Sequence, residues 1–88
     1  MNEKNSFIIY SESTPNPQVM KFVANKILVS TPKECKDVTE TGKSTLLRKL
    51  FNFPFVQELF VASNYISIKK NDTTDWMEIT NALRIFIQ

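Results

Sequence analysis

Two prolines in the segment Thr14-Pro15-Asn16-Pro17 constrain the fold of this chain more than any other feature. Each proline lacks a backbone N–H, and the residue before a proline is pushed towards extended backbone. The segment therefore cannot lie inside a β-ladder or form a tight two-residue hairpin turn. Because strand-like runs flank it, we expect a stiff surface connector between two strands.

The runs around this connector have the alternation and the β-branched or aromatic content of strands. A second strand pair follows later in the chain. It meets at Ser63-Asn64, where we expect a hairpin turn because asparagine tolerates positive φ. The expected strands cover residues 7–12, 18–25, 27–29 (a short strand), part of 34–38 (an edge strand), 55–62 and 65–70.

Two segments have the spacing of amphipathic helices. Ser44 can cap the first helix, and Pro54 should end it. Asp75 and Glu78 have the spacing of a capping box at the start of the second helix. The apolar stripes expected on the two helices are Leu46, Leu47, Leu50 and Phe51, and Trp76, Ile79, Ala82, Leu83 and Phe86.

The order of these elements predicts an α+β fold of the form ββ(β)αββα. Hairpin connections favour an antiparallel or mixed sheet of four to five strands, and two helices can cover only one of its faces. We therefore expect residues 1–88 to form one two-layer domain. Its expected core residues are Phe22, Leu46, Leu50, Phe51, Phe60, Ile66, Ile68, Trp76, Ile79 and Leu83.

The chain contains no histidine and only one cysteine, Cys35. There is thus no imidazole to activate a nucleophile or to bind zinc. One cysteine cannot form a disulfide within the chain or supply the ligands of a zinc ion or an iron–sulfur cluster. Gly42-Lys43-Ser44 resembles the end of a phosphate-binding loop, but Asp37 stands where the earlier glycine is needed. These features argue against an enzyme.

Charge and hydrophobicity argue against two further functions, nucleic-acid binding and membrane attachment. Eleven lysines and arginines face nine aspartates and glutamates, a net charge of +2, and basic residues cluster only in pairs. That pattern disfavours nucleic-acid binding. The apolar run at residues 7–10 is too short for a signal peptide or membrane span, and a single free cysteine suits a reducing compartment. We expect a cytoplasmic protein that does not bind membranes; its oligomeric state stays open.

Few side chains suggest a site of chemistry. Lys33 and Lys36 flank Cys35, but Glu34 and Asp37 offset their charge, so the sequence favours an incidental cysteine over a reactive thiol. The acidic residues match no calcium-loop pattern. The aspartates at positions 72 and 75 are better explained as loop and cap residues.

The connector has two interpretations. It can be a rigid link in which Asn16 satisfies the backbone through an Asx turn. Alternatively, it can be a preorganised loop that a protein partner recognises. Lys21 should point away from Met20 and Phe22 and so reach solvent. On the second interpretation the partner-binding residues are Thr14, Pro15, Asn16, Pro17 and Lys21.

Several motifs follow one another in register from Tyr10 to the C-terminus. Thr14-Pro15-Asn16-Pro17 precedes Met20-Lys21-Phe22, a leucine-rich run covers residues 44–51, and Asp75-Trp76 follows the strand at 65–70. Together with Val56 and Phe60, they resemble the motifs TPNPxxxKF, SPLAxxLF, GVxxVF, FITVTK and DW. Those motifs are typical of the N-terminal domain of Nfu-type iron–sulfur scaffold proteins, relatives of NifU.

Two positions depart from the family pattern. Thr45 stands where the family usually has proline, in the first helical turn, and threonine is acceptable there. Phe55 stands where a glycine usually precedes the valine. Because phenylalanine resists positive φ, we expect a different turn after Pro54 or an earlier start of the strand.

The resemblance implies a non-catalytic accessory or interaction domain in iron–sulfur cluster assembly or delivery. In that family a Cys-x-x-Cys pair in a separate C-terminal domain holds the cluster, and this chain has no such pair. It should therefore bind no cofactor itself, and its partners would be an iron–sulfur scaffold domain or target apoproteins. The alternative is a small protein–protein interaction module unrelated to iron–sulfur metabolism. A Cys-x-x-Cys domain downstream would favour the iron–sulfur accessory domain. The chain ends on a helical pattern without a cap, which is compatible with a fragment of a longer protein.

Overall fold

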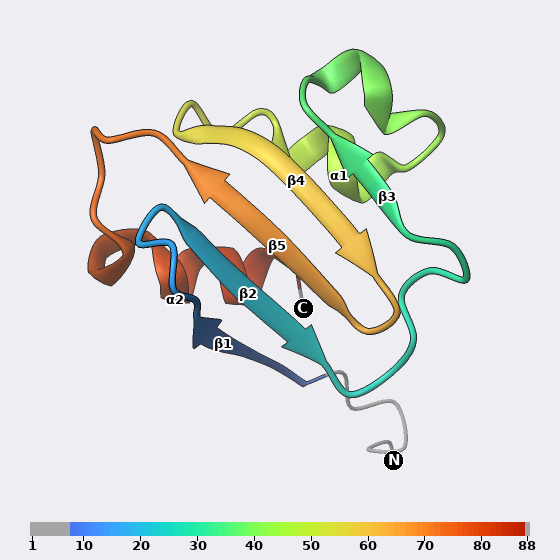
Figure 1. Cartoon of the computed structure of the whole chain (residues 1–88), viewed down its shortest axis with the longest axis horizontal. Coiled ribbons are helices and arrows are strands. Elements are labelled where there is room, and N and C mark those ends of the chain that lie inside the picture. Colours follow the sequence, from blue (N-terminus) through green and yellow to red (C-terminus); the bar gives the residue numbers. More distant parts are fainter. Residues whose placement is uncertain (1–7, 88) are drawn as a thin grey trace.

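A five-stranded antiparallel sheet forms the centre of the molecule, and its strand order is β1-β2-β5-β4-β3 (Figure 1). The computed structural model describes residues 8–87. The strands are β1 (Ile9–Ser13), β2 (Val19–Ala24), β3 (Lys33–Cys35), β4 (Val56–Ala62) and β5 (Tyr65–Lys70). The connector joins β1 to β2, as its prolines require. Of the predicted first strand, Phe7 lies outside the described residues.

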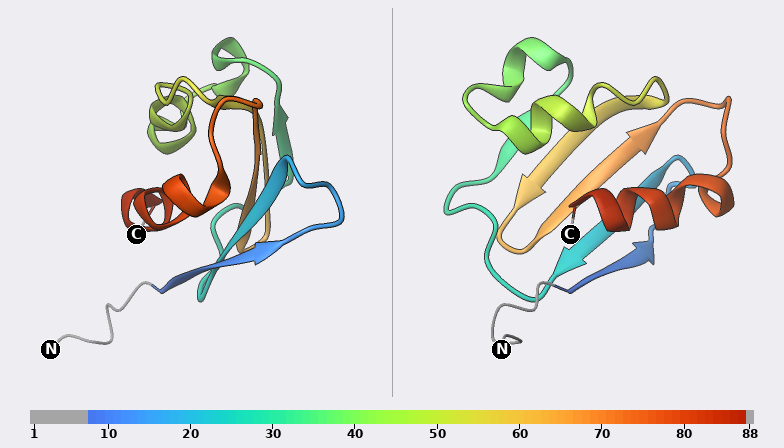
Figure 2. Two further views of the ribbon diagram at one scale, coloured as in Figure 1. Left: turned by 90° about the vertical axis from the view of Figure 1, so that its left-hand side faces the viewer. Right: turned by 180° about the vertical axis from the view of Figure 1, so that it is seen from behind.

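Two helices cover one face of this sheet. They are α1 (Thr45–Leu50) and α2 (Trp76–Ile87), and a short 3-10 helix, η2 (Val38–Thr41), precedes α1. Figure 2 shows α1 and α2 on the same side of the sheet, with no helix on the opposite side in the part of the chain that is described. The predicted two-layer α+β fold is confirmed.

Helix α1 begins as its sequence predicts. The Ser44 hydroxyl accepts a hydrogen bond from the Leu47 amide at 3.2 Å, and Thr45 occupies the first turn in place of the family proline. The helix ends at Leu50, well before Pro54. Phe53 N–H donates to the Leu50 carbonyl at 3.2 Å, so the chain tightens into i→i+3 turns before the proline is reached.

Helix α2 buries a narrower stripe than the sequence predicts. Ile79, Leu83 and Ile87 are buried, whereas Ala82 is exposed and Phe86 is 39% exposed. The buried residues recur every four positions, which places Ala82 and Phe86 on the flank. Phe86 packs edge-on against Phe53 instead, with ring centroids 5.2 Å apart.

Most of the expected core residues lie between the sheet and the helices. The fully or nearly fully buried ones are Phe22, Leu50, Ile66, Ile68, Ile79 and Leu83, and those partly buried at the margin are Leu46, Phe51 and Trp76. Phe60 is a correction, because it lies half-buried on the opposite face. A β-bulge causes this: Val56 pairs with Lys70 and Glu58 with Lys69, so Gln57 is extra and the alternation of β4 is inverted after it.

Two connecting segments differ from expectation, and the turn after Pro54 is as expected. Residues 27–29 form no strand, because the amides of Leu28 and Val29 donate to the Ser63 carbonyl rather than to a ladder. At the confirmed hairpin turn, Ser63 carries the positive φ of 48°. Beyond Pro54, the turn closes through Val56 N–H, which donates to the Phe53 carbonyl at 3.1 Å, and Phe55 has no positive φ.

Candidate functional site

The face of the sheet opposite the helices is called the open face here. Strand pairing arranges its side chains in three rows across the strands. The central row is Glu12, Lys21, Ser67, Phe60 and Glu34. The row on the side of the β4–β5 turn is Tyr10, Val23, Tyr65 and Ala62, and the row next to the connector is Val19, Lys69 and Glu58.

Aromatic rings give the open face an apolar centre. The Phe60 and Tyr65 rings lie with their centroids 6.1 Å apart, and both side chains are half-buried. Lys21 extends over the Tyr65 ring, with its Nζ 4.3 Å from the centroid. Tyr10 is 55% exposed at the β1 edge. Aromatic side chains are enriched in surfaces that bind proteins.

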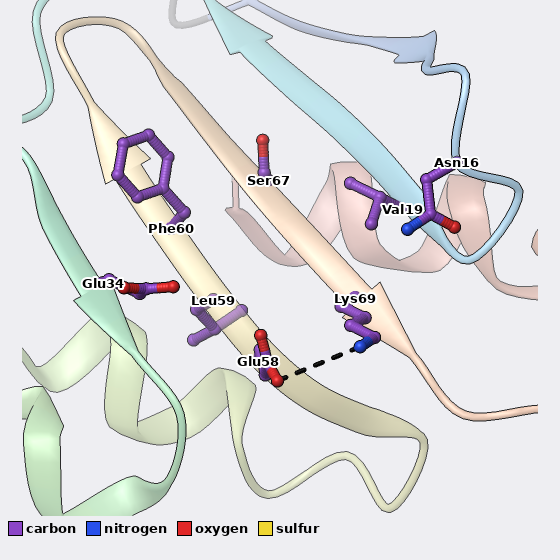
Figure 3. A pocket seen from close by; sticks show the side chains of 8 residues that line it. All are labelled: Asn16, Val19, Glu34, Glu58, Leu59, Phe60, Ser67 and Lys69. Carbon is purple, nitrogen blue, oxygen red and sulfur yellow. Dashed lines mark ion pairs between the residues drawn. The ribbon is translucent and has the colours of Figure 1, made fainter.

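A pocket of about 290 Å³ opens on this face (Figure 3). Asn16 from the connector and Val19 from β2 form one side, and Phe60 from β4 lies on the other. Ser67 lies between them on β5, and its short side chain contributes little bulk to the centre. The pocket therefore joins the connector to the open face.

Charged groups line the end of the pocket near β3 and β4. Glu58 approaches Lys69 at 3.9 Å, and their side chains remain 38% and 36% exposed. Glu34 projects into the pocket from β3 (Figure 3). Its carboxylate makes no hydrogen bond or ion pair with any residue in the described range 8–87. Two carboxylates thus face the pocket, and of these only Glu58 pairs with the ammonium group of Lys69.

The connector holds its own shape through hydrogen bonds. Asn16 Oδ1 accepts from the Gln18 amide at 2.9 Å, which is the Asx turn that the rigid-link interpretation expects. The Thr14 hydroxyl donates towards the carbonyls of Asn16 and Val19, each at 3.0 Å. Because these bonds form without a partner, the loop is preorganised, so both interpretations of the connector remain compatible with its geometry.

Helix α2 anchors the connector from the other side. The indole Nε1–H of Trp76 donates to the Pro17 carbonyl at 3.0 Å, and Gln18 donates to the Asp72 carboxylate. The Trp76 ring packs near Phe22, with centroids 6.3 Å apart. The buried Lys70, which the sequence did not single out, places its Nζ 5.7 Å from the Trp76 ring centroid.

The predicted partner-binding residues are brought together only in part. Asn16 lines the pocket, Pro15 is exposed, and Lys21 lies on the open face beside Ser67. Thr14 and Pro17 contribute bonds that shape the connector.

Sequence reasoning did not assign the other residues of the pocket to a site, among them Glu34, Glu58, Ser67 and Lys69. The alternation of β5 places Ser67 and Lys69 outside, which was a usable signal. Glu34 and Glu58 depend on the bulge and on the position of β3, and neither can be recognised from local spacing.

Cys35 is unsuited to hold a metal or a cluster. Its side chain is buried on the helix-covered face, and its Sγ donates to the Glu40 carbonyl at 3.3 Å. Burial raises the pKa of the Cys35 thiol, which disfavours the thiolate needed for metal binding. Within residues 8–87 no group of three or more histidine, cysteine, aspartate or glutamate side chains could hold a metal ion. The residues present therefore do not fit an iron–sulfur cluster.

The fold and the site define a small α+β domain with one helix-covered face and one open face. Residues 9–88 match the family described as scaffold protein Nfu/NifU N terminal. The chain therefore belongs to the Nfu/NifU N-terminal scaffold family, and the resemblance carried by its motifs is confirmed. Between residues 8 and 87, no helix has the length and apolar character needed to cross a membrane.

Two curated relatives agree with this assignment. A NifU-like protein of Schizosaccharomyces pombe is 32% identical over 77 residues, which cover 84% of this chain and 30% of that protein. The human protein named NFU1 iron-sulfur cluster scaffold homolog, mitochondrial, is 30% identical over 70 residues, covering 77% of this chain and 28% of that protein. This chain thus matches less than a third of the length of either relative.

A solved structure supports the fold independently. The crystal structure of protein SAV1430 from Staphylococcus aureus matches with a TM-score of 0.74 at 17% sequence identity. The match covers 92% of this chain and 99% of that one.

Proposed function

We propose that residues 1–88 act as a non-catalytic accessory domain in iron–sulfur cluster assembly or delivery. In this proposal the domain docks an iron–sulfur scaffold domain or a target apoprotein through its open face and connector, and it does not ligate the cluster. The observation that carries the proposal is the combination of an uncovered, partly apolar sheet face with a preorganised loop beside it. Family membership supplies the iron–sulfur context.

The open face and the connector are preorganised for docking. A partner that binds the open face meets strands fixed by ladders and a connector fixed by the Asn16 Asx turn and by Trp76. Little conformational entropy therefore remains to oppose association. Half-buried rings such as Phe60 and Tyr65 supply apolar area that a partner can cover.

Affinity capture tests this proposal with two matched variants. Ser67→Tyr fills the pocket on the open face, whereas Met77→Tyr adds the same side chain to a 96% exposed position on α2. The immobilised parent domain should capture iron–sulfur scaffold proteins or apoproteins from an anaerobic extract of the source organism, identified by mass spectrometry. Ser67→Tyr should lose them and Met77→Tyr should retain them, while both variants keep the parental thermal midpoint.

Two outcomes would contradict the proposal. Captured proteins with no connection to iron–sulfur clusters would favour an interaction module of another pathway. Equal capture by the parent and the folded Ser67→Tyr variant would remove the open face as the docking surface.

The cytoplasm is the proposed location, because the single thiol needs no oxidising compartment. The name of the human relative places that protein in mitochondria. Fractionation of the source cells, with an antibody against this domain, distinguishes the two.

A further inference from the structure

The pocket on the open face combines apolar walls with an excess of negative charge. Val19 and Phe60 supply the walls, and the polar group between them is the small Ser67. Its volume of about 290 Å³ lies at the lower limit for drug-sized ligands, which usually occupy about 300–1,000 Å³. A single long side chain from a protein partner suits such an opening better than a small molecule.

The charges of the pocket are not balanced internally. Among residues 8–87, Lys69 is the only cation that lines it, and its 3.9 Å approach to Glu58 is a weak, partly exposed pair. The carboxylate of Glu34 makes no hydrogen bond or ion pair within residues 8–87. Glu34 pairs in register with Phe60, so it lies diagonally across from Glu58 on neighbouring strands. Side chains at such diagonal positions are within reach of one long group.

We propose that this pocket binds an arginine side chain from an extended segment of the protein partner, a statement that rests on the proposed docking function. The aliphatic stem of the arginine packs between Val19 and Phe60. Its guanidinium lies between the carboxylates of Glu34 and Glu58, where it forms charge-assisted hydrogen bonds. The side-chain amide of Asn16, whose oxygen is held in the Asx turn, forms part of the wall nearest the connector.

Arginine fits this arrangement better than lysine. The guanidinium is planar and presents five donors in a fixed fork, so one group can serve two carboxylates on adjacent strands. A lysine ammonium is a compact charge that sheds its water less readily.

An anionic ligand is the main competitor, because Lys21 and Lys69 also lie on this face. Lys21, however, extends over the Tyr65 ring, and Lys69 leans towards Glu58. An anion in the pocket would face the carboxylates of Glu34 and Glu58 directly. The charge complementarity of the pocket therefore favours a cation.

The test uses three short extended peptides that differ only at their central residue, which is arginine, citrulline or phosphoserine. Citrulline keeps the shape of arginine without its charge, and phosphoserine represents an anionic partner. Each peptide is titrated into the isotopically labelled domain, and the amide shifts of Ser67 and Phe60 are followed by NMR. We expect the arginine peptide to bind about tenfold more tightly than the citrulline peptide.

Variants link this preference to the pocket. The double variant Glu34→Gln with Glu58→Gln should reduce the arginine preference to near parity, whereas Glu12→Gln, a carboxylate on the same face outside the pocket, should leave it unchanged. Asn16→Asp keeps an acceptor for the Asx turn and adds a carboxylate, so it should tighten arginine binding.

Several results would overturn the inference. These are equal affinities for arginine and citrulline, tighter binding of phosphoserine, an unchanged preference in the double variant, or no shift with any peptide. The proposed function would survive them if Ser67→Tyr still abolished capture of iron–sulfur proteins. Conversely, an arginine preference without such capture would leave the pocket chemistry intact and remove the iron–sulfur role.

Discussion

The indole Nε1–H of Trp76 donates to the carbonyl oxygen of Pro17 at 3.0 Å, across 59 positions of sequence. This bond joins the first turn of α2 to the end of the connector. It therefore links physically the two most specific motifs of the chain, Thr14-Pro15-Asn16-Pro17 and Asp75-Trp76. A tryptophan is needed at position 76 because phenylalanine has no donor and tyrosine places its donor elsewhere.

Replacing Trp76 with phenylalanine should lower the free energy of unfolding by about 0.5–1.5 kcal/mol, the usual net contribution of one hydrogen bond. Trp76→Ala should cost more, but less than the about 3–5 kcal/mol typical of a fully buried aromatic residue, since Trp76 is only partly buried. Urea unfolding measures both. A Trp76→Phe variant with parental stability and unshifted Pro17 and Gln18 resonances would show that the hydrogen bond does not hold the connector.

The Asx turn of Asn16 should contribute to the stability of the domain. Asn16→Ala removes the acceptor for the Gln18 amide and should cost about 0.5–1.5 kcal/mol, whereas Asn16→Asp retains an acceptor and should stay close to the parent. Thermal unfolding compares the pair. Equal stability of the alanine and aspartate variants would argue that the Asx turn contributes nothing.

Substitution of Lys21 tests whether this residue of the open face serves partner binding rather than stability. Lys21→Gln keeps most of the side-chain stem and removes the charge above Tyr65, so at most about 0.5–1 kcal/mol of stability should be lost. We expect weaker capture of the iron–sulfur partner by this folded variant. Lys49→Gln, an exposed lysine on α1 on the helix-covered side of the sheet, serves as the control. Parental capture by Lys21→Gln would exclude Lys21 from the docking surface.

The burial of Cys35 predicts that the stability of the folded protein depends on pH. Burial raises the pKa of its thiol, so the folded protein holds this proton more tightly than the unfolded chain does. The stability that the protonated Cys35 thiol gives the folded protein is complete below the ordinary thiol pKa of about 8.5. This stability is lost as the pH rises through the higher pKa of the folded state. The stability difference between the parent and Cys35→Ala should therefore shrink at alkaline pH in urea titrations. A difference independent of pH would contradict the assigned burial.

The elements of the fold could be predicted because their signals are local. Alternation marks β2 and β5, and Ser44 with its following leucines marks α1. The position of Phe60 could not be predicted in the same way, because the bulge at Gln57 inverts which residues of β4 face the helices. Strict alternation from Val56 would place Phe60 in the core.

The candidate site could be predicted only where its signals are local, at the connector and at the outward positions of β5. Asn16 was identified because prolines and an asparagine that can form an Asx turn are local signals of a turn. Glu34 and Glu58 reach the same pocket only because β3 pairs with β4 in one particular register, and Trp76 reaches Pro17 only after α2 packs on the sheet. Such long-range relationships depend on the assembled sheet, and no spacing in the sequence encodes them directly.

Anaerobic reconstitution tests most directly the claim that the domain docks partners without holding the cluster itself. The purified domain is incubated with iron, sulfide and a thiol reductant, desalted, and examined for sulfur-to-iron charge-transfer absorption and bound iron. Because Cys35 is buried and the chain has no histidine, we predict neither charge-transfer absorption nor stoichiometric iron. A stoichiometric cluster that disappears in a folded Cys35→Ala variant would contradict the account.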